Sequence, residues 1–267
     1  MFYDCYLGLL QPRAFGEKGW SECSQSGPAC SAEAQSPSKP AGPPMPSVPV
    51  GVARPGGQKA SVTVELFLDL CCPYSNKMFK TISEHVAPKY EGEAGLMNIC
   101  SLTQATLDMN KESLSQVKFV FHSVAQPWHA QSCYMHEASL AVLDSAGPQK
   151  FWDFAGALFC KQEEFFDDMV MDKTRNELYS ELAKVAEEVG VAPAEVLNRL
   201  QLKPGNAGSA VTQRFKWATK LHRSRGVHVT PTVHLNGLEA GVVGSGWSPE
   251  EWQSFLDYHL AEAKHAA

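Results

Sequence analysis

The chain has 267 residues, of which 44% are hydrophobic, and a formal net charge of -6. This length allows one large domain or two small ones with a well-buried core. The acidic balance favours neither nucleic acid nor an anionic membrane as a partner, and no apolar run reaches the length of a membrane span.

The first residues, Met1–Val48, are rich in proline, glycine and serine and lack apolar periodicity, which predicts a disordered extension. Within it, Met1–Leu10 lacks a basic stretch followed by an apolar one, so we expect no secretory signal and a cytoplasmic location. The eight cysteines include no C-x-x-C pair. In a cytoplasmic chain without a secretory signal, we expect these cysteines to be mostly reduced thiols.

The segment Val62–Phe79 carries the strongest local pattern. Ser61–Leu70 is apolar and β-branched enough for a buried strand, and apolar residues then recur at helical spacing from Met78 onward. Between them lies Cys72, followed by Pro73, which suits a first helical turn. A thiol at a helix N-terminus sees the positive end of the helix dipole and free N–H groups, so the pattern favours a nucleophilic thiolate at Cys72.

The neighbours of Cys72 leave several roles open. Most free cysteines are small buried hydrophobes, a role that we expect for Cys71. The Ser75 hydroxyl either donates a hydrogen bond to the Cys72 thiolate or satisfies backbone donors of the first turn. Because serine forms no disulfide, a two-cysteine cycle within this motif is excluded. Asp69, at the strand end, either helps to move the thiol proton or caps the turn.

The rest of the chain predicts a second strand, a block of helices, a hairpin and a closing helix. The first helix should end near Ala87, because Pro88 interrupts it, and Val117–Val124 should lie parallel to the first strand. Helical patterns cover about 131–145, 148–162, 174–189, 193–200 and 207–225. A strand over Val227–Leu235 should turn back at Asn236-Gly237, and a capping box at Ser248 should open the last helix.

The segment around Cys72 resembles the active-site strand and helix of DsbA-like thioredoxin-fold proteins. It is also similar to the opening of kappa-class glutathione transferases and 2-hydroxychromene-2-carboxylate isomerases, which carry V-E-L-F-x-D-x-x-S-P-Y-S. Cys72 occupies the place of their catalytic serine, and Ser75 that of the second cysteine of a dithiol oxidoreductase. Three further segments resemble a eukaryotic DsbA-like group with a C-P-[YF]-S site: Gln126-Pro127-Trp128-His129, Phe151-Trp152-Asp153-Phe154 and Val229-Thr230-Pro231-Thr232.

This resemblance implies an α/β, thioredoxin-like (DsbA-like) fold with a core of residues 49–125 and 226–267 and a helical insertion of residues 126–225. It also implies that Thr230-Pro231 is the cis-proline loop facing Cys72, whose backbone would pair with an extended peptide or glutathione. The same groove would be lined by Pro73, Tyr74, Trp128 and His129, although Trp128 and His129 could also belong to the core.

His129, Cys133 and His136 have spacing i, i+4, i+7, which would place them on one helix face and suggest a metal site. A fourth ligand is not evident, so we expect no metal. The aromatic group Phe151–Phe154 has the helical spacing typical of core.

Three functions remain open. The first is a monothiol, glutathione-linked thiol–disulfide oxidoreductase, in which Cys72 attacks a disulfide or glutathionylated sulfur and external glutathione resolves the product. The second is a kappa-type transferase or isomerase, in which Cys72 activates glutathione. The third is a non-enzymatic thioredoxin-fold module that binds peptides. In the first two, glutathione is a co-substrate rather than a bound cofactor, and protein thiols or disulfides are the other expected partners.

Overall fold

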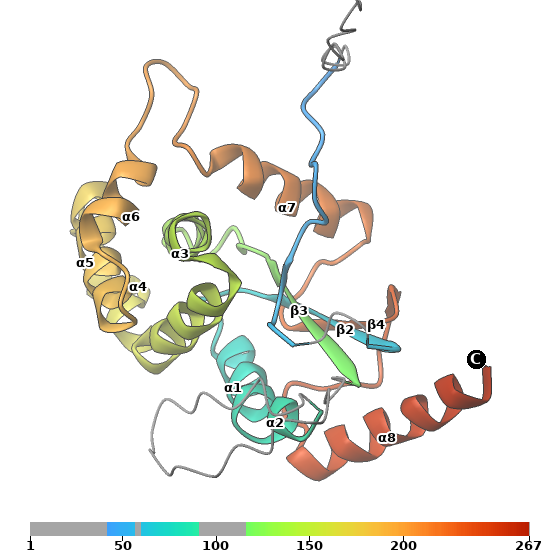
Figure 1. Ribbon diagram of the computed structural model, residues 1–267. Coiled ribbons are helices and arrows are strands. Elements are labelled where there is room, and N and C mark those ends of the chain that lie inside the picture. Colours follow the sequence, from blue (N-terminus) through green and yellow to red (C-terminus); the bar gives the residue numbers. More distant parts are fainter. Residues whose placement is uncertain (1–41, 57–59, 91–115, 267) are drawn as a thin grey trace, which may run out of the picture. The chain divides into compact units, whose positions relative to one another are not determined.

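A mixed sheet forms the centre of the fold. The computed structural model describes residues 42–56, 60–90 and 116–266, and Pro44–Ala267 form one compact unit (Figure 1). In this part of the chain the sheet has five strands in the order β1-β3-β2-β4-β5. Their bounds are β1 Val52–Ala53, β2 Val62–Leu68, β3 Val117–Ser123, β4 Thr232–Leu235 and β5 Leu238–Glu239.

The sheet pairing follows most of the predicted order. β2 and β3 are parallel, with Val62 beside Val117, which confirms the parallel placement of these strands. β1 and β4 pair antiparallel with β3 and β2, respectively. Between β4 and β5, Asn236 (φ 49°) and Gly237 (φ 88°) both have positive φ, as the predicted two-residue hairpin turn requires.

The helices lie before β3, between β3 and β4, and at the C-terminus. The described residues contain α1 Pro73–Thr81, a π-helical turn η1 Ile82–Val86, α2 Ala87–Tyr90, α3 Ser132–Cys160, a 3-10 turn η3 Gln162–Phe165, α4 Asp167–Val170, α5 Arg175–Glu188, α6 Pro193–Leu200, α7 Thr212–Ser224 and α8 Pro249–Ala266. α1, α2 and α8 lie on one side of the sheet and α7 on the other (Figure 1). The predicted capping box is present at α8, where the Ser248 and Glu251 side chains accept from each other's backbone N–H.

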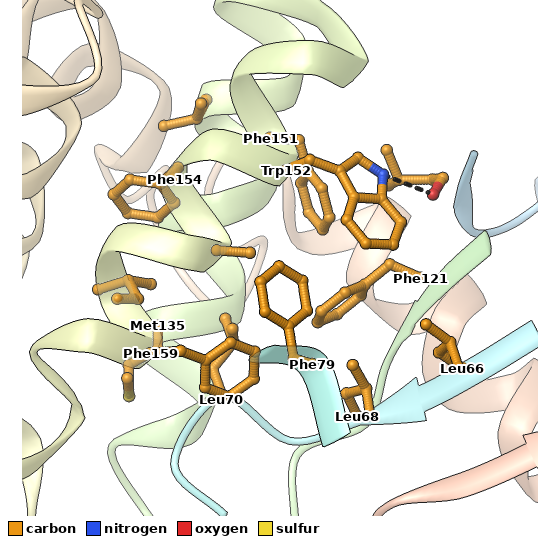
Figure 2. Packing of buried hydrophobic residues seen from close by; sticks show 14 of the residues in the cluster. Leu66, Leu68, Leu70, Phe79, Phe121, Met135, Phe151, Trp152, Phe154 and Phe159 are labelled. Carbon is orange, nitrogen blue, oxygen red and sulfur yellow. Dashed lines mark hydrogen bonds between the residues drawn. The ribbon is translucent and has the colours of Figure 1, made fainter. Parts of the chain in front are cut away.

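The main core lies between the sheet and the long helix α3 (Figure 2). Because side chains alternate along a strand, Leu66 and Leu68 of β2 point to this side. Phe79 of α1 stacks on Trp152 of α3, with ring centroids 5.6 Å apart. The indole of Trp152 also donates a 3.2 Å hydrogen bond to the Val52 carbonyl in β1. The aromatic group 151–154 is therefore core, as predicted.

The prediction that the first helix ends near Ala87 is wrong. The helical path continues through η1 into α2, which contains Pro88. A π turn widens the helix by one residue, which relieves the clash between a proline ring and the carbonyl four residues earlier. Ile82 and Val86, on this wider turn, remain fully buried.

Other boundaries differ from the pattern where glycine and proline alter the backbone. α3 spans two predicted helices, which meet at a kink at Gly147 (φ 83°). α7 begins at Thr212 rather than near residue 207, after a turn at Gly208 (φ 73°). The strand predicted over Val227–Leu235 is regular only in β4. The extension predicted over Met1–Val48 lies mostly outside the described residues, although the Pro44 carbonyl accepts a hydrogen bond from Trp217 of α7.

Candidate active site

Cys72 is the N-cap residue of α1, at the point where the chain leaves β2. Its backbone is extended (φ -80°, ψ 122°) and Pro73 is the first helical residue, as the sequence predicts. The Cys72 N–H donates to the Asp69 carbonyl (3.1 Å), which closes the turn between strand and helix. The side chain is 6% exposed, whereas Pro73 and Tyr74 beside it lie on the surface.

The loop before β4 faces the Cys72 thiol. The Thr230–Pro231 peptide is cis, and the Thr230 carbonyl accepts a 3.4 Å hydrogen bond from Cys72 Sγ. These residues are 158 positions apart in the chain. The predicted pairing of the thiol with the proline loop is thus present in the structure.

The Asp69 carboxylate is fully buried and joins three segments around Cys72. Oδ1 accepts from the Cys71 N–H (2.8 Å) and from Ser132 Oγ (2.5 Å). Oδ2 accepts from the Gln126 N–H and from His129 Nδ1, both at 2.9 Å. Within the described residues, the Cys72 side chain is not one of the groups that donate to this carboxylate. Asp69 therefore caps the turn, the alternative that the sequence left open, and it also orients His129.

Ser75 is fully buried in the first turn of α1. Its Oγ accepts a 3.2 Å hydrogen bond from the Asp69 N–H. This satisfies a backbone donor that precedes α1, not a donor of the first helical turn, so the contact differs from both roles that the sequence left open. The hydroxyl proton is not used in this contact, so the oxygen can still donate.

Cys71 points away from the surface, as predicted, and is 2% exposed. Its sulfur accepts a hydrogen bond from Gln131 Nε2 at 3.1 Å. Burial, with smaller contributions from Asp69 and Asp167, raises the pKa of the Cys71 thiol to about 12. Cys71 therefore stays protonated and inert at neutral pH, although it adjoins Cys72.

The residues predicted to line a groove surround this turn with exposed apolar surface. Tyr74 is 65% exposed and Trp128 61% exposed, which places Trp128 outside the core. His129 is intermediate, with 19% of its side chain exposed. The segment that carries Trp128 is tied to the proline loop, because Gln126 Nε2 donates to the His228 carbonyl at 3.2 Å.

Amide side chains that the sequence did not single out hold α1 against α3 and η3. Gln162 Nε2 donates to the Leu70 carbonyl at 2.8 Å, just before the active-site turn. Asn76 Nδ2 donates to the Phe159 carbonyl (2.8 Å) and to Gln162 Oε1 (3.2 Å). These contacts join residues more than eighty positions apart, so no local pattern could have revealed them.

His136 of α3 supports the same turn from inside the core. It is completely buried, and its Nε2 accepts a 3.4 Å hydrogen bond from the Leu70 N–H. Burial lowers the pKa of His136 to about 4. The side chain is therefore neutral at pH 7, and its Nε2 acts as an acceptor for the Leu70 N–H.

We expect His136 to make folding sensitive to acid. The unfolded chain binds a proton near pH 6.5 and the folded chain only near pH 4, so the stabilisation is complete above 6.5 and is lost as the pH falls toward 4. The free energy of unfolding should fall by ~3 kcal/mol across this window through this group. Urea unfolding of wild type and His136→Gln at several pH values measures it, with the exposed His85→Gln as control. An equally steep loss in His136→Gln would contradict the assignment.

A second buried polar cluster lies on the opposite side of the sheet and anchors the segment that leads into the proline loop. Glu65 Oε1 contacts His122 Nε2 at 3.0 Å and accepts from Arg225 at 2.6 Å. The hydrogen bond from His122, and then that from Arg225, lower the pKa of Glu65 to about 2 despite its burial. Because Arg225 directly follows α7, this ion pair fixes where the chain turns toward Thr230.

The structure gives no support for the metal site suggested by His129, Cys133 and His136. His129 precedes α3 and bonds to Asp69, whereas His136 is enclosed in the core. Across residues 42–56, 60–90 and 116–266, no group of three histidine, cysteine, aspartate or glutamate side chains is placed to hold a metal ion. Within the same ranges, no helix has both the length and the apolar character needed to cross a membrane.

A thiol at a helix N-terminus after a buried strand, facing a cis-proline loop, is the arrangement of a thioredoxin-like (DsbA-like) fold. Comparisons with solved structures agree with this fold. A Pseudomonas syringae protein, provisionally named a protein-disulfide isomerase, matches over 77% of this chain and 97% of its own, with a TM-score of 0.57 and 24% identity. BdbD from Bacillus subtilis matches over 79% of this chain and 93% of its own, with a TM-score of 0.53 and 21% identity.

The thiol–disulfide exchange protein alpha-DsbA2 from Wolbachia pipientis is also similar, over 78% of this chain and 86% of its own, with a TM-score of 0.52 and 16% identity. Identities this low establish the shared fold and leave the reaction to the residues of the site. No protein-family profile and no curated protein sequence matches the chain.

Proposed function

We propose that the protein is a monothiol, glutathione-linked thiol–disulfide oxidoreductase with Cys72 as its nucleophile. The observation that carries this proposal is the position of Cys72 at the N-terminus of α1, with its thiol against the Thr230 carbonyl. Helix N-terminal N–H groups stabilise an anion, and the thiolate is the form that attacks a disulfide. The proteins of similar fold named above include a thiol–disulfide exchange protein, which is consistent with this chemistry.

The absence of a second thiol in the motif supports a monothiol cycle. Ser75 occupies the position one helical turn on, and Cys71 is buried with a raised pKa. In the first step the Cys72 thiolate attacks the glutathione sulfur of a glutathionylated substrate. The substrate–glutathione S–S bond breaks, the Cys72–glutathione disulfide forms, and the substrate leaves as a thiolate that takes a proton from water. In the second step an external glutathione attacks the Cys72–glutathione disulfide, which releases oxidised glutathione and restores the Cys72 thiol.

The surface around Cys72 suits an extended thiol-bearing peptide. Exposed Tyr74 and Trp128 offer apolar contact, while the backbone beside the cis proline offers hydrogen-bonding groups. Glutathione, itself a short peptide with a thiol, has the chemistry that these groups would recognise.

Turnover of a glutathionylated peptide by glutathione tests the proposal. We expect the protein to accelerate this exchange with ping-pong kinetics, because a covalent intermediate separates the two steps. Binding of glutathione with conjugation of an electrophile, but no disulfide exchange, would instead support a kappa-type transferase. Peptide binding without either reaction would support the third alternative, a non-enzymatic peptide-binding module.

A further inference from the structure

At the turn that leads into Cys72, a histidine and a buried carboxylate form a pair whose arrangement suits proton transfer. Asp69 Oδ2 lies 2.9 Å from His129 Nδ1, and the carboxylate is enclosed and held by three other donors. A carboxylate accepts hydrogen bonds, so Nδ1 carries the proton in this contact. In the neutral ring, Nε2 then holds the free lone pair, which is the arrangement of a general base.

The same contacts tie His129 to the turn that carries Cys72. Asp69 is three residues before Cys72, and its carbonyl accepts the Cys72 N–H within a tight turn. On the other side, Gln126 links the His129 segment to the His228 carbonyl, two residues before the Thr230 carbonyl that contacts Cys72 Sγ. His129 and Cys72 thus belong to one hydrogen-bonded frame, and the exposed part of the His129 ring borders solvent.

We propose that His129, oriented by Asp69, transfers the proton in the step that resolves the Cys72–glutathione disulfide. This inference rests on the proposed function. The sulfur of an incoming glutathione thiol bonds to the glutathione sulfur of the adduct, and the Cys72 sulfur leaves with the electron pair of the broken S–S bond. His129 Nε2 takes the proton from the attacking thiol and delivers it to the Cys72 thiolate. No oxidant or reductant beyond glutathione enters this step.

The size of the effect follows from thiol acidity. A thiol with a pKa of ~8.5 is only a few per cent ionised at pH 7, so a base that removes its proton raises the rate at most about 30-fold there. We therefore expect the resolving step to slow about tenfold without His129 at pH 7. The difference should vanish as the pH rises to the pKa of the attacking thiol, because the thiolate then forms unaided.

The test is the rate at which glutathione removes a preformed glutathione adduct from Cys72, followed by intact mass from pH 6 to 9. His129→Asn keeps an amide donor toward Asp69 but removes the base, and His85→Asn replaces an exposed histidine elsewhere. We expect a shallow pH profile for wild type and the control, and a near tenfold rise per pH unit for His129→Asn. An unchanged profile in His129→Asn would overturn the inference while leaving the adduct, and so the proposed function, in place.

A second thiol separates proton transfer from a structural effect. A thiol acidic enough to be ionised at pH 7 needs no base, so it should resolve the adduct equally fast in wild type and His129→Asn. If His129→Asn is slow with this thiol as well, His129 contributes to the structure of the site, and the proton-transfer role is wrong. If the wild type forms no adduct at all, the proposed function fails first, and the inference with it.

Discussion

Replacing Cys72 with serine is expected to abolish the turnover of a glutathionylated peptide and to leave the fold intact. A serine hydroxyl does not ionise near neutral pH and does not attack disulfides, so the rate should fall to that of the reaction without protein. The fold should survive, because the hydrogen bond that this side chain donates to the Thr230 carbonyl can be made by a hydroxyl as well. A coupled assay of oxidised glutathione formation measures the rate, and circular dichroism checks the fold.

Cys133→Ser is the matched control, since Cys133 is a free cysteine on the surface of α3. It should retain full turnover, because its sulfur lies outside the turn that holds Cys72. Turnover that persists in Cys72→Ser, or that disappears in Cys133→Ser, would show that Cys72 is not the nucleophile.

Replacing Ser75 with cysteine is expected to convert the site into a C-P-Y-C dithiol. Side chains three residues apart on a helix face each other at about 5–6 Å between Cβ atoms, which is close enough for a disulfide to form with a small adjustment. The new thiol should attack the Cys72–glutathione disulfide from within, so the adduct should become short-lived and an internal disulfide should accumulate. Reduction of a protein disulfide such as insulin should then appear or rise.

The same change carries a penalty in stability. Ser75 Oγ accepts the Asp69 N–H in a fully buried site, and sulfur is a weaker acceptor, so the reduced variant should lose about 1–3 kcal/mol. Ser75→Ala removes the same acceptor without adding a thiol and is the control for this loss. If Ser75→Cys keeps a stable glutathione adduct and forms no internal disulfide, the geometry inferred for this turn is wrong.

The local signals of the sequence predicted most of the secondary structure around the site. Pro73 after Cys72, the Asn236-Gly237 turn and the Ser248 capping box each act within a few residues, and each is present as predicted. The passage through Pro88 was missed because a π turn depends on how the helix packs, for which sequence spacing gives no sign. Apolar residues continue on both sides of the Thr230-Pro231 loop, so the sequence predicts one continuous strand there. In the structure the loop interrupts this strand, and only β4 is regular.

The candidate site was predictable only in part, for a similar reason. The strand–turn–helix pattern placed Cys72 correctly, and the resemblance placed Thr230 opposite it. Turn capping by Asp69 was one of the two roles that the sequence offered, but its contacts with Ser132 and His129 were not predictable, because these partners lie about sixty positions away. Buried carboxylates need donors, so a carboxylate at the end of an apolar strand signals that such partners exist but does not identify them.

The location of the first glutathione adduct tests the central claim most directly. The full chain is incubated with oxidised glutathione at pH 7, and the adduct is counted by intact mass and located by peptide mapping. We predict one glutathione on Cys72, formed before any other cysteine reacts and stable until free thiol is added. No adduct, or adducts only on other thiols such as Cys133 and Cys160, would contradict the assignment of Cys72 as the nucleophile.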